Sequence, residues 1–433
     1  MMSAPRSFLL TTWEGGGTVA PMITVARRLV ARGHRVRMMC DEASRREIAV
    51  AGAAFAPWTS APNRQDRTPA SDYIRDWDVE GVEAFKRALD AAWAGPALAY
   101  ARDLIEALRR EPADLVVTCE LLLGVAVGCE AARQPYVMLS ANVSIFPIAG
   151  IPPMGPGLRP PRNEEEVRKQ AGLREALATG FDHALPALNA ARGALGLAAL
   201  KRTMEQTAPA RAFLLGTAQA FDFAPGQLPV GVRYVGPQLD EPGWTVPWTA
   251  PFPAADQRPL VLVAFSTTFQ DHGAVMQRVL DAAETLPVRV LVTLGGSLEA
   301  AALRPPANAR LVPSAPHDQV MGMAALVVTH GGHGTVLRAL AHQLPLLVVP
   351  HGRDQADNAA RVAERGAGLV LPRTAATAAL RSALHALLSE AKFSEAARSL
   401  GSAVAAEAAG SPVVSLLEAY ASDTPPTDRV LLS

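Results

Sequence analysis

Eight prolines lie within the 35 residues between positions 225 and 259, and this proline-rich stretch divides the chain into two halves. Proline has no backbone N–H and a fixed φ, so such a stretch cannot form a regular helix or a central strand. On both sides of it, short apolar runs alternate with helical patterns. This alternation predicts two α/β units, each built on a parallel sheet, joined by a linker.

The expected elements follow from the hydrophobic pattern of each half. A helix is predicted over residues 21–31, and an alanine-rich stretch from about 375 to 420 predicts the helices that close the second half. Strands are predicted at 8–12, 35–39, 114–118, 136–139 and 213–215, and after the linker at 260–265, 288–293, 326–329 and 346–349. We therefore expect an α/β fold of two facing doubly wound, Rossmann-like domains, at 1–224 and 260–421, with a C-terminal helix and a tail over 422–433. Ligands are expected in the cleft between the domains, at the carboxyl ends of the strands.

Composition narrows the function classes. The chain has 433 residues, 41 basic and 41 acidic, so its formal net charge is zero and it lacks the basic surplus of a nucleic-acid-binding protein. Three cysteines are too few for a disulfide framework and fit a reducing compartment. Apolar runs such as 345–350 are far shorter than the ~20 residues that a membrane span needs. We expect a cytoplasmic protein without stable membrane insertion.

The most specific motif begins at the predicted strand over 326–329. After this strand the chain passes through His330-Gly331-Gly332-His333-Gly334, and a helix is predicted to start near Thr335. Glycines let the backbone approach a ligand closely, and a helix N-terminus presents unpaired N–H groups with a partial positive charge. The His330 imidazole and the Thr335 hydroxyl can add hydrogen bonds. The segment predicts a cradle for a pyrophosphate.

The loop after the next predicted strand carries Asp354 and Gln355. An adjacent carboxylate and carboxamide offer several acceptors and donors, which suit the vicinal hydroxyls of a sugar. A metal site is the competing interpretation, because four histidines (330, 333, 342 and 351) lie nearby. No carboxylate or thiol has ligand spacing with them, so we expect no metal.

This segment resembles the C-terminal signature of the nucleotide-sugar-dependent glycosyltransferases of the GT-B fold, in the branch that holds macrolide and other natural-product glycosyltransferases. The residues that carry the resemblance are His330 to Thr335, Pro345, Pro350, Asp354-Gln355, Asn358-Ala359 and Gly366-Ala367-Gly368. Weaker similarity extends over nearly the whole chain. The resemblance implies an inverting transferase that uses no metal and no cofactor besides its nucleotide-sugar co-substrate, a UDP- or TDP-hexose or deoxyhexose. Formation of a homodimer stays open.

The resemblance also implies which residues contact the donor. Contacts with the nucleotide-sugar donor are expected from Ser266 and Thr267, after the first strand of the second half, and around the nucleobase from Ser314, Ala315 and His317. Along the diphosphate they are expected from His330, Gly332, His333, Gly334 and Thr335, and at the sugar from Asp354 and Gln355. On the acceptor side, Trp13 and Phe146 could line an apolar pocket for a lipophilic small molecule such as a natural product or phenol.

The expected catalytic base is missing. Relatives carry a Gly-His-x-x-Pro pattern in the first loop, and an Asp orients that His; here Thr18 stands at the His position and Cys119 at the Asp position. A threonine hydroxyl cannot act as a base near neutral pH. We expect Glu14 or Glu120 to replace it, because an apolar cleft raises the pKa of a carboxyl group, with Thr18 as a hydrogen-bond partner of the acceptor. An acceptor that needs little base assistance, such as a phenol, an amine or a carbon nucleophile, also stays open.

Three further functions remain as alternatives. The missing His would suit a catalytically silent nucleotide-sugar binder or a helper subunit of a partner transferase. Gly15, Gly17 and Ala20, followed by Asp41, match the dinucleotide fingerprint and would suit an NAD-dependent oxidoreductase. A sugar-nucleotide epimerase would share the diphosphate site and act on the donor alone.

Overall fold

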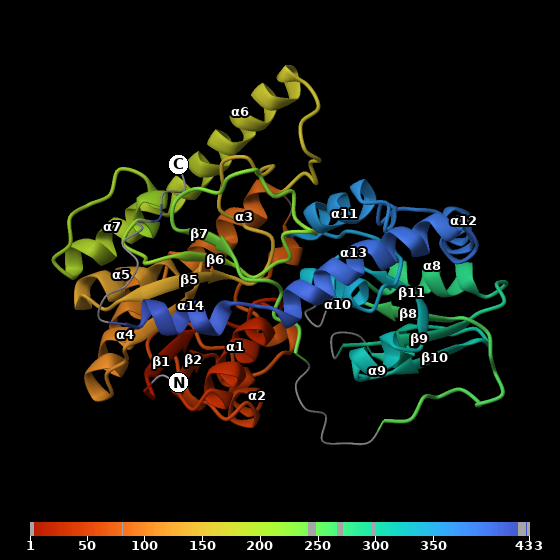
Figure 1. Ribbon diagram of the computed structural model, residues 1–433, viewed down its shortest axis with the longest axis horizontal. Coiled ribbons are helices and arrows are strands. Elements are labelled where there is room, and N and C mark those ends of the chain that lie inside the picture. The colour runs from red at the N-terminus through yellow and green to blue at the C-terminus, as the bar shows by residue number, and fades with distance from the viewer. Residues whose placement is uncertain are drawn as a thin grey trace.

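The computed structural model describes residues 4–79, 81–240, 248–265, 272–295, 299–422 and 430. It has two parallel sheets, one in each half of the chain (Figure 1). The first sheet has the strand order β3-β2-β1-β4-β5-β6-β7. Its strands are β1 (Ser7–Thr11), β2 (Arg35–Cys40), β3 (Ala54–Pro57), β4 (Leu115–Cys119), β5 (Tyr136–Ser140), β6 (Phe213–Leu215) and β7 (Val232–Tyr234). The helices of this half are α1 (Val19–Ala31), α2 (Arg45–Val50), α3 (Val82–Ala88), α4 (Ala97–Arg110), α5 (Leu123–Ala132), α6 (Glu164–Phe181) and α7 (Leu185–Ala194).

The second sheet has the order β10-β9-β8-β11-β12-β13. Its strands are β8 (Leu260–Ala264), β9 (Arg289–Thr293), β10 (Ala309–Val312), β11 (Ala324–Thr329), β12 (Leu346–Val348) and β13 (Gly368–Val370). The helices of this half are α8 (Gly273–Ala283), α9 (His317–Met321), α10 (His333–Ala341), α11 (Gln355–Glu364), α12 (Thr377–Ser389), α13 (Ala391–Ala409) and α14 (Val413–Tyr420). Neighbouring strands in both sheets run parallel, which confirms the predicted α/β fold.

The strands predicted from the sequence are the central ones. Every residue of β1, β4, β5, β8 and β12 is buried, as expected for strands covered by helices on both faces. Strands β3, β10 and β13, and β7 within the proline-rich stretch, were not predicted. β7 pairs only with β6 at one end of the first sheet, where proline-rich chain is tolerated. The predicted domain bounds stay a prediction.

The last helices connect the second half back to the first (Figure 1). Helix α13 packs closely on α10, because a Cβ at Gly401 would lie 2.0 Å from the Leu340 carbonyl oxygen. Helix α14 lies on the first half, where Glu418 pairs with His34 at 2.9 Å and with Arg32 at 3.1 Å. By length and composition alone, the span Ala391–Tyr420 could cross a membrane. In the structure this span is divided into two helices, each packed on a different half of the protein.

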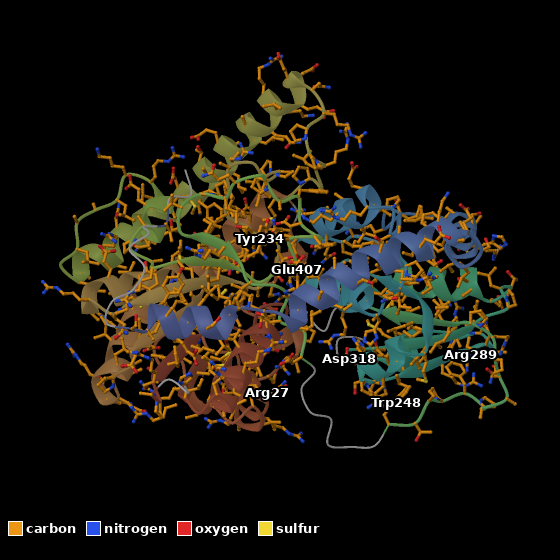
Figure 2. All side chains as sticks on the ribbon, in the orientation of Figure 1. Arg27, Tyr234, Trp248, Arg289, Asp318 and Glu407 are labelled. Carbon is orange, nitrogen blue, oxygen red and sulfur yellow. The ribbon has the colours of Figure 1, made fainter. Side chains whose placement is uncertain are left out.

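Polar contacts, some of them buried, join the two halves. Asp222, which follows β6, accepts hydrogen bonds from Arg361 of α11 at 2.6 and 2.8 Å and from the Tyr234 hydroxyl at 2.8 Å. Glu407 of α13 accepts the backbone N–H groups of residues 219 and 220 at 2.6 and 2.9 Å. Tyr234 and Glu407 lie near the junction of the two halves in Figure 2. These contacts place the carboxyl end of the second sheet against the carboxyl end of the first.

Candidate functional site

The glycine-rich turn after β11 is shaped by close contacts that leave no room for side chains. Gly331 has a φ of +96°, and a Cβ there would lie 2.8 Å from Val348 Cγ1. A Cβ at Gly332 would lie 2.7 Å from His330 Nε2. Helix α10 begins at His333, two residues earlier than predicted. The N–H groups of its first turn have no acceptor within the helix, which is the geometry that an anion site at a helix start requires. The pyrophosphate cradle stays a prediction.

The two histidines of the turn have different surroundings. His330 is buried, and burial lowers its pKa to about 3, with repulsion from His351 and Arg353 adding to the effect. The neutral form of His330 is therefore favoured at physiological pH. The His333 side chain instead points to the first half, where its Nε2 lies 2.9 Å from Thr217 Oγ1. The His333 imidazole thus joins the two halves, and only the backbone N–H of His333 remains for the predicted contact with the nucleotide-sugar donor.

The predicted sugar-binding pair lies at the start of α11. The Asp354 carboxylate accepts a hydrogen bond from Asn358 Nδ2 at 2.9 Å, and the same amide donates to the Gly331 carbonyl at 2.9 Å. Burial raises the pKa of Asp354. Gln355 is fully buried, and its Oε1 accepts the backbone N–H groups of residues 351 and 352 at 2.7 and 3.2 Å. Asn358 thus joins the predicted sugar-binding pair to the glycine-rich turn, and Gln355 shapes the loop that carries Asp354.

The residues predicted to surround the nucleobase of the donor lie at the ends of β9 and β10. Ser314 is exposed, Ala315 is buried, and His317 is the first residue of α9. Thr293 Oγ1 lies 3.4 Å from His317 Nε2, and burial lowers the pKa of His317 to about 4. Ser266 and Thr267 lie outside the described residues, so their predicted donor contacts stay predictions.

Glu120, one of the two predicted bases, is a buried carboxyl group with a raised pKa. It follows β4 and is 1% exposed, and its Oε1 accepts a hydrogen bond from the Ser140 hydroxyl at 2.9 Å. Burial raises the pKa of Glu120 to about 7, and the charge of Asp354 in the other half adds to the effect. A carboxyl group with a pKa near the working pH can accept a proton in one step and release it in another. The charge of the predicted sugar-binding carboxylate of the second half thus acts on the predicted base of the first half.

Glu14, the other predicted base, is held by fixed partners. Its Oε2 accepts hydrogen bonds from Ser44 Oγ at 2.8 Å and from two nitrogens of Arg67 at 2.9 and 3.0 Å. These partners hold the Glu14 carboxylate in place within the first half, so the geometry favours Glu120 over Glu14. Thr18 precedes α1, and its hydroxyl donates to the Trp13 carbonyl at 2.7 Å, which leaves an oxygen lone pair for an acceptor molecule.

The two predicted acceptor-lining aromatics are both buried. Trp13 lies directly on the first glycine loop, since a Cβ at Gly15 would lie 2.5 Å from its ring. Phe146 is 2% exposed and packs against Phe181 and Phe213, with ring centroids 5.3 and 5.8 Å apart. The expectation that Phe146 lines an acceptor pocket is therefore corrected, because the ring is part of the core of the first half.

Sequence reasoning missed the contacts that join the sugar loop to the first half. Arg353 has a φ of 56°, and its guanidinium pairs with Asp76 at 2.7 and 2.9 Å. Asp357 accepts the N–H groups of Gly155 and Gly157 at 2.8 and 3.2 Å. Arg353 and Asp357 are close to Asp354 in the sequence, and this closeness was the only signal of their role. Their partners, Asp76 for Arg353 and the loop of residues 155–157 for Asp357, are distant in sequence. Among the described residues, no group of three or more His, Cys, Asp or Glu is arranged to hold a metal ion.

Comparison with known proteins gives consistent matches. A family model described as "Erythromycin biosynthesis protein CIII-like, C-terminal domain" matches residues 277–420. The 4'-demethylrebeccamycin synthase of Lentzea aerocolonigenes is 30% identical over 422 residues, covering 95% of this chain and 98% of that protein. Among solved structures, the calicheamicin glycosyltransferase CalG4 has a TM-score of 0.72 at 23% identity, covering 98% of this chain and 100% of that one. The spinosyn rhamnosyltransferase SpnG, solved with thymidine diphosphate, has a TM-score of 0.65 at 20% identity, covering 95% and 100%.

Proposed function

Because the chain belongs to the natural-product branch of the GT-B glycosyltransferases, we propose that it moves a hexose or deoxyhexose from a UDP- or TDP-sugar to a lipophilic small-molecule acceptor. We further propose that the transfer inverts the anomeric carbon, needs no metal or resident cofactor, and takes place in the cytoplasm. The observation that carries the proposal is the hydrogen-bonded link between the glycine-rich turn and Asp354, in which Asn358 Nδ2 donates to the Gly331 carbonyl and to the Asp354 carboxylate, each at 2.9 Å.

The donor would lie along the carboxyl end of the second sheet. The first turn of α10 offers backbone N–H groups to the diphosphate, and His330 lies beside them. Asp354 would accept hydrogen bonds from sugar hydroxyls, since Asn358 already occupies one of its oxygens and holds the carboxylate in place. The nucleobase of the donor would lie near Ala315 and His317, at the ends of β9 and β10.

The reaction would be a single displacement. The Glu120 carboxylate takes the proton of the acceptor hydroxyl while that oxygen attacks the anomeric carbon from the face opposite the diphosphate. The bond from the anomeric carbon to the phosphate oxygen breaks, and its electron pair stays on the leaving diphosphate. One attack from the opposite face inverts the anomeric carbon.

The comparisons support the substrate classes. SpnG was solved in one structure with thymidine diphosphate and in another with the spinosyn aglycone. The matching family is described by erythromycin biosynthesis, and the 30% identical relative is a synthase of 4'-demethylrebeccamycin. A nucleoside diphosphate and an aglycone are accordingly the first ligands to test.

The structure disfavours the dinucleotide alternative. In an NAD site the acidic residue after the second strand must be available to ribose hydroxyls. Here Asp41 is completely buried, and its two oxygens accept the backbone N–H groups of Glu14 at 2.8 Å and Arg64 at 2.6 Å. The Asp41 carboxylate therefore has a structural role in the first half.

The test is a mass-spectrometric screen of the purified protein with UDP- and TDP-hexoses against a panel of polyketide, indole and phenolic aglycones. A product heavier than the acceptor by one sugar residue supports the proposal, and Asp354→Asn should lower its yield. Tight binding of a nucleotide sugar with neither transfer nor donor hydrolysis across the panel would instead favour the silent-binder alternative. Epimerised donor in the absence of acceptor would favour the epimerase.

A further inference from the structure

Three histidine rings gather around one phenylalanine at the donor site. They come from three different loops of the second sheet: His272 from the segment before α8, His330 from the turn after β11, and His351 from the loop after β12. The His272 ring centroid lies 4.6 Å from that of His351 and 5.6 Å from that of His330. The ring centroid of Phe265 lies 5.2 to 6.1 Å from the centroids of all three histidine rings. Only His330 belongs to the motif that the sequence identified.

The packing of the rings gives the Nε2 atom of His272 no hydrogen-bond partner. His272 is 6% exposed, and its Nε2 is buried with no hydrogen-bond partner among the described residues. The His351 Nδ1 lies 2.8 Å from the Val349 carbonyl oxygen, which fixes the proton on Nδ1 and leaves Nε2 as the nitrogen that can gain one. The His330 Nε2 lies beside the Gly332 backbone at the start of α10. A buried imidazole nitrogen without a partner in such a cluster points to a ligand that supplies one.

The charges around the cluster indicate the sign of that ligand. Arg353 acts on both His272 and His330, and its guanidinium is paired with Asp76 of the first half, while Asp354 follows it in the chain. Burial, His330, His351 and Arg353 lower the pKa of His272 to about 2, and burial, His351 and Arg353 lower that of His330 to about 3, so both of these rings favour the neutral form. The first turn of α10 adds only partial positive charge. A diphosphate diester carries two negative charges, so it would meet a cluster that can gain a proton.

We propose that His272, His330 and His351 form one phosphate-binding cluster, which takes up a proton from solvent when the diphosphate of a nucleotide sugar binds. The inference rests on the proposed function and goes beyond it by adding His272 and His351 to the site. The proton would remain on the cluster during the reaction. When the bond to the sugar breaks, the new negative charge on the leaving phosphate oxygen would then face an imidazolium.

The experiment is isothermal titration calorimetry of the full chain with UDP-glucose and TDP-glucose, in buffers of low and high ionisation enthalpy. The diphosphate of these probes does not titrate near neutral pH, so proton uptake reports on the protein. We expect uptake of about one proton at pH 7.5 and a Kd that rises up to tenfold per pH unit above that. His272→Phe keeps an aromatic ring in the cluster and should reduce both the uptake and the pH dependence. His351→Phe should have the same effect.

Two further variants make the outcome decisive. His385→Gln changes an exposed histidine of α12 and should leave uptake and affinity unchanged. If thermal melting shows that His272→Phe is not folded, His272→Gln gives the same test with a polar, non-titrating side chain. Binding without proton uptake by the wild type, or unchanged uptake in the His272 and His351 variants, would overturn the inference and leave the proposed function intact. Failure of both probes to bind would contradict the proposed donor site itself.

Discussion

Glu120→Gln should make the protein less active and, at neutral to alkaline pH, more stable. The amide can still accept the Ser140 hydroxyl but cannot take a proton from an acceptor molecule. Removing a general base costs about 10²- to 10⁴-fold in rate, so kcat with an alcohol acceptor should fall by that factor. In the wild type, kcat/KM should rise tenfold per pH unit up to about pH 7 and then level off, because Glu120 must be ionised to act.

The change in stability comes from the same carboxyl group, and its sign follows from the difference between the pKa of Glu120 in the folded state and in the unfolded state. The pKa of Glu120 rises from 4.5 to about 7 on folding, mainly through burial. The folded state therefore holds a proton that the unfolded state releases, and stability is lost as pH rises from 4.5 to 7. At ~1.36 kcal/mol per pKa unit, the full loss is about 3 kcal/mol above pH 7 and close to zero below pH 4.5. Glutamine does not ionise, so the variant avoids this loss.

The assay is urea denaturation of wild type and variant at pH 5 and pH 8, followed by tryptophan fluorescence, beside kinetics with an aliphatic alcohol acceptor. Glu14→Gln is the matched control, because it removes one of the two carboxylate partners of Arg67 and should lower stability at both pH values. Two results would refute the reasoning: wild-type turnover by Glu120→Gln, or an equal stability difference at pH 5 and pH 8.

Three further predictions concern the turn and the junction between the halves. Gly331→Ala places a Cβ 2.8 Å from Val348 in left-handed backbone, so calorimetry should show loss of nucleotide-sugar binding together with lower stability. Arg361→Leu leaves the buried Asp222 carboxylate without its cation and should cost about 3–5 kcal/mol in chemical denaturation, whereas the double variant with Asp222→Asn should recover part of it. Asp357, whose pKa burial raises to about 6, should hold the loop of residues 155–157 best above pH 6; Asp357→Asn should speed hydrogen exchange of the Gly155 and Gly157 amides and remove the pH dependence of their protection between pH 5 and 7.

The sequence predicted the elements whose structure is set locally. Central strands are covered on both faces and appear as continuous apolar runs, so β1, β4 and β8 were found within one or two residues. Edge strands such as β3 and β10 are short and partly exposed, and their sequences do not differ from those of loops. The glycine turn was predictable for the same local reason, since its glycines and the following helix start are adjacent in sequence.

Contacts between distant residues could not be predicted in this way. Arg353 and Asp76 are 277 positions apart, and nothing in either local pattern indicates the pair. The burial of Phe146 was misjudged because an apolar residue in a proline-rich loop suits both a pocket and a core. His272 precedes a helix as an isolated histidine, and only the folded sheet brings it to His330 and His351.

The replacement of both members of the expected His–Asp pair has a physical explanation in Glu120. With Thr18 in place of the histidine, an aspartate at position 119 would be a buried carboxylate without its cation, which costs several kcal/mol. Cys119 removes that charge, because burial raises the pKa of its thiol and keeps it neutral. A proton acceptor at Glu120, one residue further along the chain, would take the place of the pair, since burial and the charge of Asp354 raise its pKa to about 7. Sugar hydroxyls that donate to Asp354 would weaken its repulsion of Glu120, so donor binding should shift the kinetic pKa of the base downward, towards the ionised form that catalysis needs.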